Sequence, residues 1–108
     1  MHFVVIGKDK ADGQARKERR ADHLEFVAGA QDGIVYAGPL LDEGRMIGSL
    51  FVFDLPSRDA LDAHLARDPY FAPGMFETVE IYESRWMAPE REKGFLAEEA
   101  RKMRAADA

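Results

Sequence analysis

His23 is the residue whose neighbours best suit it to chemistry. Arg20 and Arg19 lie three and four residues before it, so on a helix the three side chains share one side. A histidine beside guanidinium groups tends to lose its proton and become a neutral base, whereas a nearby carboxylate favours the charged form. Asp68, followed by Pro69, is a candidate for that carboxylate. The same pattern is also typical of a histidine at the core edge with only a structural hydrogen bond.

The rest of the sequence contains little that binds a metal or a cofactor. His2 and His64 have no second histidine or carboxylate at metal-ligand spacing and are expected to be structural or surface residues. There is no HExxH motif, Gly-rich phosphate loop or Walker-type lysine. The chain has no cysteine, which excludes thiol catalysis, thiolate metal sites and disulfides. We therefore expect no metal and no cofactor.

The apolar pattern predicts the element order β-α-β-β-α-β. Strands are expected at residues 1–7, 34–40, 45–54 and 76–86, and helices at residues 14–31 and 57–68. Leu24, Val27 and Ala28 recur at helical spacing and are expected to form the buried stripe of the first helix. Ser57 is expected to cap the second helix, and Asp68 to end it, because a residue before proline disfavours helical conformation. This order is ferredoxin-like, an α+β fold with one four-stranded antiparallel sheet.

The first and third strands are apolar on both faces. Phe3 and Val5 alternate with Val4 and Ile6, and Phe51 and Phe53 alternate with Leu50 and Val52. Two helices cover only one face of such a sheet, so the second face needs another cover. A second copy of the chain would remove this apolar area from water at roughly 25 cal/mol per Å², which predicts a homodimer. The alternative is that the C-terminal segment folds back over this face.

Residues 88–108 are expected to be a helical extension of a domain formed by residues 1–87. Pro89 suits a first helical position, and Glu90 suits the first turn. A modest apolar stripe runs through this charged segment, formed by Phe95, Leu96, Ala100 and Met103. The extension is expected to be an arm that packs on its own domain or on the partner subunit, or else a partly frayed tail.

The charge balance limits the partners. The formal net charge is −5, and the one basic cluster, from Arg16 to Arg20, is interrupted by Glu18. Nucleic-acid binding needs a basic field that displaces counterions, so we do not expect it. No apolar run approaches a membrane span, and the first residues lack the pattern of a signal peptide. We expect a cytoplasmic protein without a membrane partner.

Several short motifs follow one another in a characteristic order. They are Lys8-Asp9-Lys10-Ala11-Asp12, Arg20-Ala21-Asp22-His23-Leu24, Ala37-Gly38-Pro39, Gly48-Ser49 and Asp68-Pro69-Tyr70. With this order and spacing, about residues 1–87 resemble the YciI-like (YCII-related) family. The Arg-x-x-His-Leu and Asp-Pro-Tyr motifs carry most of the resemblance. It implies a dimeric α+β barrel with a pocket between sheet and helices.

The resemblance also implies site residues. The family's His and Asp, proposed as its catalytic pair, correspond to His23 and Asp68, and Arg20 and Ser49 correspond to positions that line the pocket. Related proteins include a dehydrochlorinase of chlorinated hydroxyquinols, and the expected shape is similar to that of muconolactone isomerase. The chain departs from many relatives in a shorter link between its second and third strands and in its helical tail. Both departures would reshape the pocket mouth.

The first hypothesis for function is an enzyme without a cofactor. His23 would be a general base that Asp68 orients, Arg20 would hold an anionic oxygen, and Ser49 would donate a hydrogen bond. Tyr70 is expected to wall the pocket together with Phe71, although both suit the core equally well. The substrate would be a small cyclic or aromatic, oxygenated molecule, and the reaction an isomerisation, an elimination or lactone chemistry.

Two other hypotheses share the same fold, because a fold does not determine a function. One is a non-catalytic module that binds a small ligand or serves as an accessory subunit. The other is a cofactor-free monooxygenase, which oxygen uptake with a quinol would distinguish.

Overall fold

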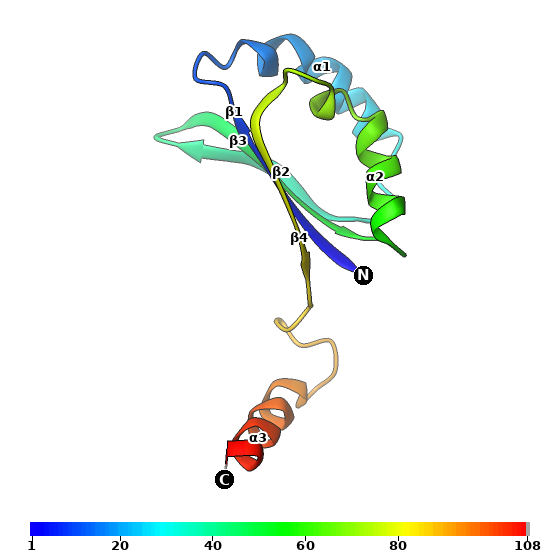
Figure 1. The fold of residues 1–108 in the computed structure, drawn as a ribbon, viewed down its shortest axis with the longest axis vertical. Helices are drawn as coiled ribbons and strands as arrows, with labels where there is room; N and C mark the ends of the chain where they lie inside the picture. Colours follow the sequence, from blue (N-terminus) through cyan, green and yellow to red (C-terminus); the bar gives the residue numbers. More distant parts are fainter. Residues whose placement is uncertain (108) are drawn as a thin grey trace.

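Four antiparallel strands form one sheet that carries two helices on one face. The structure, a computed structural model, describes residues 1–107, and its strands are β1 (His2–Asp9), β2 (Ile34–Asp42), β3 (Arg45–Asp54) and β4 (Phe76–Ser84). Their order in the sheet is β2-β3-β1-β4. Helices α1 (Gln14–Ala28) and α2 (Arg58–Arg67) lie side by side over this sheet (Figure 1), and a short 3-10 turn, η1 (Pro69–Phe71), follows α2. The predicted ferredoxin-like order is confirmed.

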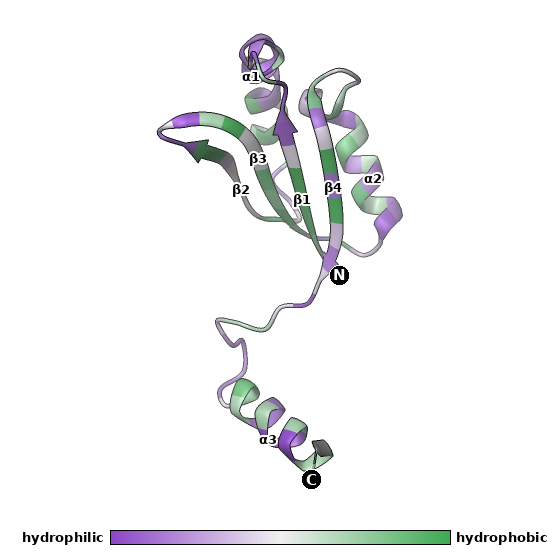
Figure 2. Cartoon of the chain, turned by 60° about the vertical axis from the view of Figure 1, so that its left-hand side comes forward, coloured by the Kyte–Doolittle hydropathy of each residue, from purple (hydrophilic) through white to green (hydrophobic). Residues whose placement is uncertain are grey.

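The alternation of side chains along β1 and β3 builds the core. The register pairs Phe3 with Phe53 and Val5 with Phe51, and all four are buried under the helices. The core is completed by Leu61, Leu65, Tyr70 and Met75. The intervening residues Val4, Ile6, Leu50 and Val52 are half-buried on the opposite face. Both strands therefore have an inner and an outer apolar face, as predicted, and Figure 2 shows the hydrophobic stretches along them.

Helix α2 begins and ends as its sequence predicts. The Ser57 side chain accepts a hydrogen bond from the Ala60 N–H at 3.1 Å, which satisfies one of the free donors of the first turn. Asp68 is extended, with φ −85° and ψ 123°, and ends the helix before Pro69. Asp68 therefore leaves the helix at the point where its side chain turns toward α1.

The buried face of α1 differs from the prediction. Leu24 is 49% exposed and Ala28 is exposed, whereas the buried residues of α1 are Arg16 and His23. These two lie seven residues apart, about two helical turns, and so on one face. Val27 is half-buried, but the apolar stripe predicted through Leu24 and Ala28 is wrong, because α1 turns Arg16 toward Ser49 and stacks His23 on the core residue Tyr70 instead. The polar inner face of α1 is the first indication of a site.

The C-terminal helix α3 (Phe95–Asp107) begins later than predicted. Pro89 lies before it in a loop, where its carbonyl accepts a hydrogen bond from the Trp86 indole at 2.6 Å. The Glu90 carboxylate accepts hydrogen bonds from the N–H groups of Gly94 at 2.8 Å and Leu96 at 3.0 Å. Glu90 thus satisfies donors at the start of α3 from outside the helix.

Helix α3 stands away from the sheet in both ribbon views (Figures 1 and 2). The chain is correspondingly elongated, with a longest extent of 55 Å. The structure therefore does not show this segment folded back over the outer face of the sheet, which was the alternative to a dimer. Within residues 1–107, no helix combines the length and the apolar composition that crossing a membrane requires.

Candidate functional site

His23 and Asp68 meet although 45 residues separate them in the chain. His23 Nδ1 lies 2.8 Å from Asp68 Oδ1, and the two side chains are 11% and 1% exposed. The same carboxylate oxygen accepts a hydrogen bond from the Tyr70 N–H at 2.9 Å. Asp68 is therefore held by the start of η1, and it holds the imidazole in turn. We call these two residues the dyad.

The orientation of the His23 ring determines which nitrogen is available. An Asp68 carboxylate accepts a hydrogen, so in the neutral ring Nδ1 carries the proton and Nε2 has a free lone pair. Within residues 1–107, the ring makes one hydrogen bond, through Nδ1, so Nε2 has no partner. Since no buried side-chain nitrogen or oxygen in this range lacks a partner, Nε2 is not a buried atom. Nε2 is therefore accessible to a ligand. The Tyr70 ring stacks on the imidazole at a centroid distance of 3.7 Å and fixes its plane.

Arg16 is a site residue that the sequence analysis did not select. Its guanidinium makes two hydrogen bonds to Asp9, with Nε 2.6 Å from Oδ2 and Nη2 3.0 Å from Oδ1. Nη2 also donates to Ser49 Oγ at 2.8 Å, and Nη1 donates to the Tyr70 hydroxyl at 3.4 Å. The position of Arg16, two turns before His23, is the signal that could have identified it.

Arg16 leaves two hydroxyl groups ready to donate. Ser49 and Tyr70 each accept a hydrogen bond from Arg16, so the hydrogen of each hydroxyl is free for a ligand. Burial raises the pKa of Tyr70 above its ordinary value of 10, and the positive charges of Arg16 and Arg20 offset only part of this rise. Tyr70 therefore keeps its proton at neutral pH and is a donor. Ser49, 3% exposed, lies on β3 at the edge of the core.

A cavity of about 170 Å³ brings the site residues together. Its polar lining comprises His23, Ser49, Tyr70, Arg16 and Arg20, and its apolar lining includes Leu24, Val27, Ala37, Pro39 and Phe51. Asp68 is not part of this lining but contacts His23 through the hydrogen bond to Nδ1. The predicted residues Arg20, Ser49 and Tyr70 thus share one cavity with His23. The volume suits one small ring, and the lining combines an accessible base with hydrogen-bond donors.

Two predicted neighbours are not part of this cavity. Arg19 points elsewhere, and its guanidinium donates to the carbonyl oxygens of Ala72 at 3.3 Å and Pro73 at 3.2 Å. Phe71 packs into the core, with its ring 5.3 Å from that of Phe51. Within the described part of the chain, no group of three or more His, Cys, Asp or Glu side chains could hold a metal ion.

His64, one helical turn before Asp68, is buried in an aromatic cluster. Its ring lies 5.4 Å from that of Phe26 and 4.9 Å from that of Phe53. Burial lowers the pKa of His64 below its ordinary value of 6.5. The negative charge of Asp68 raises this pKa in part, and the positive charge of Arg67 lowers it further. His64 is structural, as predicted, and it is neutral in the folded protein at neutral pH.

The free energy of unfolding is expected to fall as the pH falls through about 6.5. Because the pKa of His64 is lower in the folded chain than in the unfolded one, the unfolded chain binds more protons in this range. The contribution of His64 to stability is therefore fully present above about pH 6.5 and is lost as the pH falls below that value. Urea unfolding at a series of pH values should show a shallower fall for His64→Leu. Equal slopes would mean that folding does not change the proton affinity of His64.

Both the sequence and the fold of the chain are similar to those of known proteins. Residues 1–85 match the sequence profile of the YCII-related domain. A search of curated proteins finds no match. Among solved structures, 5-chloro-2-hydroxyhydroquinone dehydrochlorinase from Burkholderia phenoliruptrix AC1100, in complex with 2,5-dihydroxybenzoquinone, is similar with 26% identity and a TM-score of 0.69. The match covers 81% of this chain and 94% of the dehydrochlorinase.

More distant structures share the fold. A protein from Agrobacterium tumefaciens has 14% identity and a TM-score of 0.55, over 83% of this chain and 96% of that one. An antibiotic biosynthesis monooxygenase has 14% identity and a TM-score of 0.53, over 80% of this chain and 97% of that one. The resemblance predicted from the ordered motifs is confirmed by the profile match over most of the chain. The chain belongs to the YCII-related domain family.

Proposed function

We propose that the chain is a small-molecule enzyme in which His23 is the general base and Asp68 its positioning partner. The observation that carries this proposal is the 2.8 Å contact between Nδ1 and the Asp68 carboxylate, which leaves Nε2 free beside the cavity. A base needs this combination of a defined tautomer and an accessible lone pair. The substrate would be a small cyclic or aromatic, oxygenated molecule.

The proposed chemistry is a proton transfer next to a carbonyl or phenolic oxygen. His23 Nε2 takes a proton from the substrate, and the electron pair of the broken bond moves toward the oxygen. The Ser49 and Tyr70 hydroxyls donate to the oxyanion that forms, and Arg20 adds positive charge. The imidazolium, stabilised by Asp68, returns the proton at another atom in an isomerisation, or an anionic group leaves the substrate in an elimination.

The similar solved enzyme supports an elimination in particular. Its activity is the dehydrochlorination of a chlorinated hydroxyhydroquinone, and it was solved with a dihydroxylated quinone. A ring of this kind suits the cavity volume of about 170 Å³ next to His23. General acid–base catalysis contributes about 10²- to 10⁴-fold, which suffices for an activated ring with a good leaving group and requires no cofactor.

A ligand screen of wild type and His23→Ala tests the proposal. Thermal unfolding is measured with 2,5-dihydroxybenzoquinone, chlorinated hydroquinones, catechols, lactones and cyclic acids, and each compound that stabilises the wild type is then assayed for product. We expect a compound that stabilises the wild type, shifts His23→Ala less and is turned over. Saturable binding without product would instead favour the non-catalytic ligand-binding module.

We also propose that the chain forms a homodimer through the outer face of the sheet. One row across this face joins Tyr36, Val52, Val4 and Tyr82 in register. Tyr36 and Tyr82 are 58% and 54% exposed, so the row ends in two large exposed rings. The division into a domain of residues 1–87 and an extension of residues 88–108 belongs to the same proposal, and the position of α3 away from the sheet supports it.

Val52→Glu is expected to convert the dimer to a monomer in sedimentation experiments. A carboxylate at the centre of the row would have to lose its hydration in the interface, which costs several kcal/mol, on the order of the free energy of a weak dimer. Leu24→Glu is the control, because Leu24 is 49% exposed on the helical layer and not on this face. A monomeric wild type, or a Val52→Glu protein that stays dimeric, would refute this interface.

A further inference from the structure

A second and larger cavity adjoins the dyad cavity. It has a volume of about 620 Å³ and lies between the loop after β1, the first turns of α1 and the start of β3. Arg16 and Arg20 line both cavities, so the two share a wall. Met46 and Ile47 provide apolar lining on the β3 side. Apart from these two shared arginines, the residues that line the larger cavity have no part in the proposed proton transfer.

The lining of this cavity is basic although the whole chain is acidic. The cavity is lined by five cationic side chains, Lys10, Arg16, Lys17, Arg20 and Arg45, and by two carboxylates, Asp9 and Asp12, whereas the net charge of the chain is −5. Both oxygens of Asp9 accept from Arg16, and Asp12 accepts from the Gln14 N–H at 3.0 Å. With five cations against two carboxylates, the lining keeps a net positive charge.

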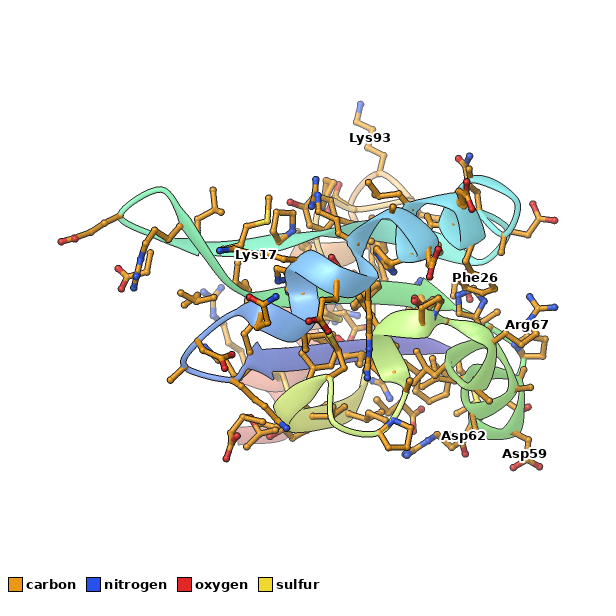
Figure 3. All side chains as sticks on the ribbon, turned by 90° about the horizontal axis from the view of Figure 1, so that it is seen from above. Lys17, Phe26, Asp59, Asp62, Arg67 and Lys93 are labelled. Atoms are coloured by element: carbon orange, nitrogen blue, oxygen red, sulfur yellow. The ribbon has the colours of Figure 1, made fainter. Side chains whose placement is uncertain are left out.

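Four of these cations are available to a ligand. Within residues 1–107, Lys10, Lys17, Arg20 and Arg45 form no ion pair, and each is exposed. Figure 3 shows Lys17 on the side of α1 that faces the β2–β3 hairpin, from which Arg45 comes. Guanidinium and ammonium groups that line one cavity attract an anion and hold it with charge-assisted hydrogen bonds.

We propose that this cavity binds a carboxylate carried on a short side chain of the substrate ring. The ring would occupy the dyad cavity, and the side chain would pass Arg16 and Arg20 into the basic cavity, with its methylene groups against Met46 and Ile47. The substrate class is then a hydroxylated aromatic or quinonoid acid rather than a neutral ring. The position of the ring rests on the proposed function, whereas the anion site depends only on the basic cavity.

Two compounds that differ only in the acid side chain test this inference. The Kd of 1,4-hydroquinone and of 3-(2,5-dihydroxyphenyl)propionate would be measured by NMR titration under exclusion of air. We expect the propionate to bind the wild type at least about 10-fold more tightly, as one charge-assisted contact allows. We expect its advantage to shrink with added salt and the amides of residues 10–13 and 45–47 to shift.

Charge-removing variants locate the effect. Lys17→Gln and Arg45→Gln are each expected to reduce the preference for the propionate several-fold while leaving the Kd of hydroquinone unchanged. Lys93→Gln is the matched control, because it removes the same charge from an exposed residue that lies outside the cavity (Figure 3). Equal affinities for the two compounds, or an equal loss in Lys93→Gln, would overturn the inference.

The same titration separates this inference from the catalytic proposal. If no compound is turned over but the preference for the propionate persists and depends on Lys17 and Arg45, the basic cavity is still an anion site, in a binding protein. If turnover depends on His23 but the two compounds bind alike, the dyad is supported and the carboxylate subsite is wrong.

Discussion

Arg16→Met is expected to lower the free energy of unfolding by about 3–5 kcal/mol. The ion pair of Arg16 with Asp9 is buried, with both side chains 6% exposed. Removing the guanidinium leaves the buried Asp9 carboxylate without its two hydrogen bonds. The Ser49 and Tyr70 hydroxyls lose their donor at the same time. Urea unfolding followed by circular dichroism measures the loss.

Two further variants show that the loss comes from an unpaired buried charge. Arg58→Met removes an arginine that also pairs with an aspartate, Asp62, at 2.9 Å, but both side chains are 55% exposed. This control should cost less than about 1 kcal/mol, because exposed pairs contribute little. The double variant Arg16→Met with Asp9→Leu should recover much of the loss, since no lone charge remains. If Arg16→Met costs no more than Arg58→Met, Asp9 is solvated and the argument is wrong.

His23→Gln is expected to lower kcat by about 10²- to 10⁴-fold for the substrate that the ligand screen identifies. Glutamine has no basic nitrogen, so it cannot take the proton that Nε2 accepts. Its amide still donates a hydrogen bond, which allows the Asp68 carboxylate to keep a partner. We therefore expect a loss in kcat with little change in the midpoint of thermal unfolding. Steady-state kinetics together with calorimetry separate the two effects.

Asp68→Asn tests the positioning role of the second residue. The amide keeps an oxygen that accepts from the Tyr70 N–H, but it lacks the negative charge that stabilises an imidazolium at His23. We expect a smaller loss in kcat than for His23→Gln, with KM little changed, because the imidazolium forms only after the substrate has bound. His2→Gln is the control, since His2 lies near Trp86 and away from the cavity. Unchanged turnover in both dyad variants would refute the catalytic proposal.

Much of the architecture follows from local patterns in the sequence. The alternation Phe3, Val4, Val5 predicts a strand with two faces, and Ser57 and Pro69 mark the limits of α2, because capping and proline sterics act within a few residues. The ordered motifs also identified the family and placed His23 and Asp68 in one pair. Local patterns failed at Pro89, where a loop precedes α3 and Glu90 satisfies the first turn from a distance.

The site itself depends on contacts between distant segments. The sequence by itself determined the element order, the family and the candidate dyad, because propensities, caps and motifs are properties of neighbouring residues. Only the tertiary structure decided that Arg16 is buried, since Asp9, Ser49 and Tyr70 come from three other segments and together satisfy its guanidinium. The inner face of α1 is polar for the same reason: the partners of Arg16 and His23 come from other segments, and helical periodicity alone does not reveal what a helix packs against.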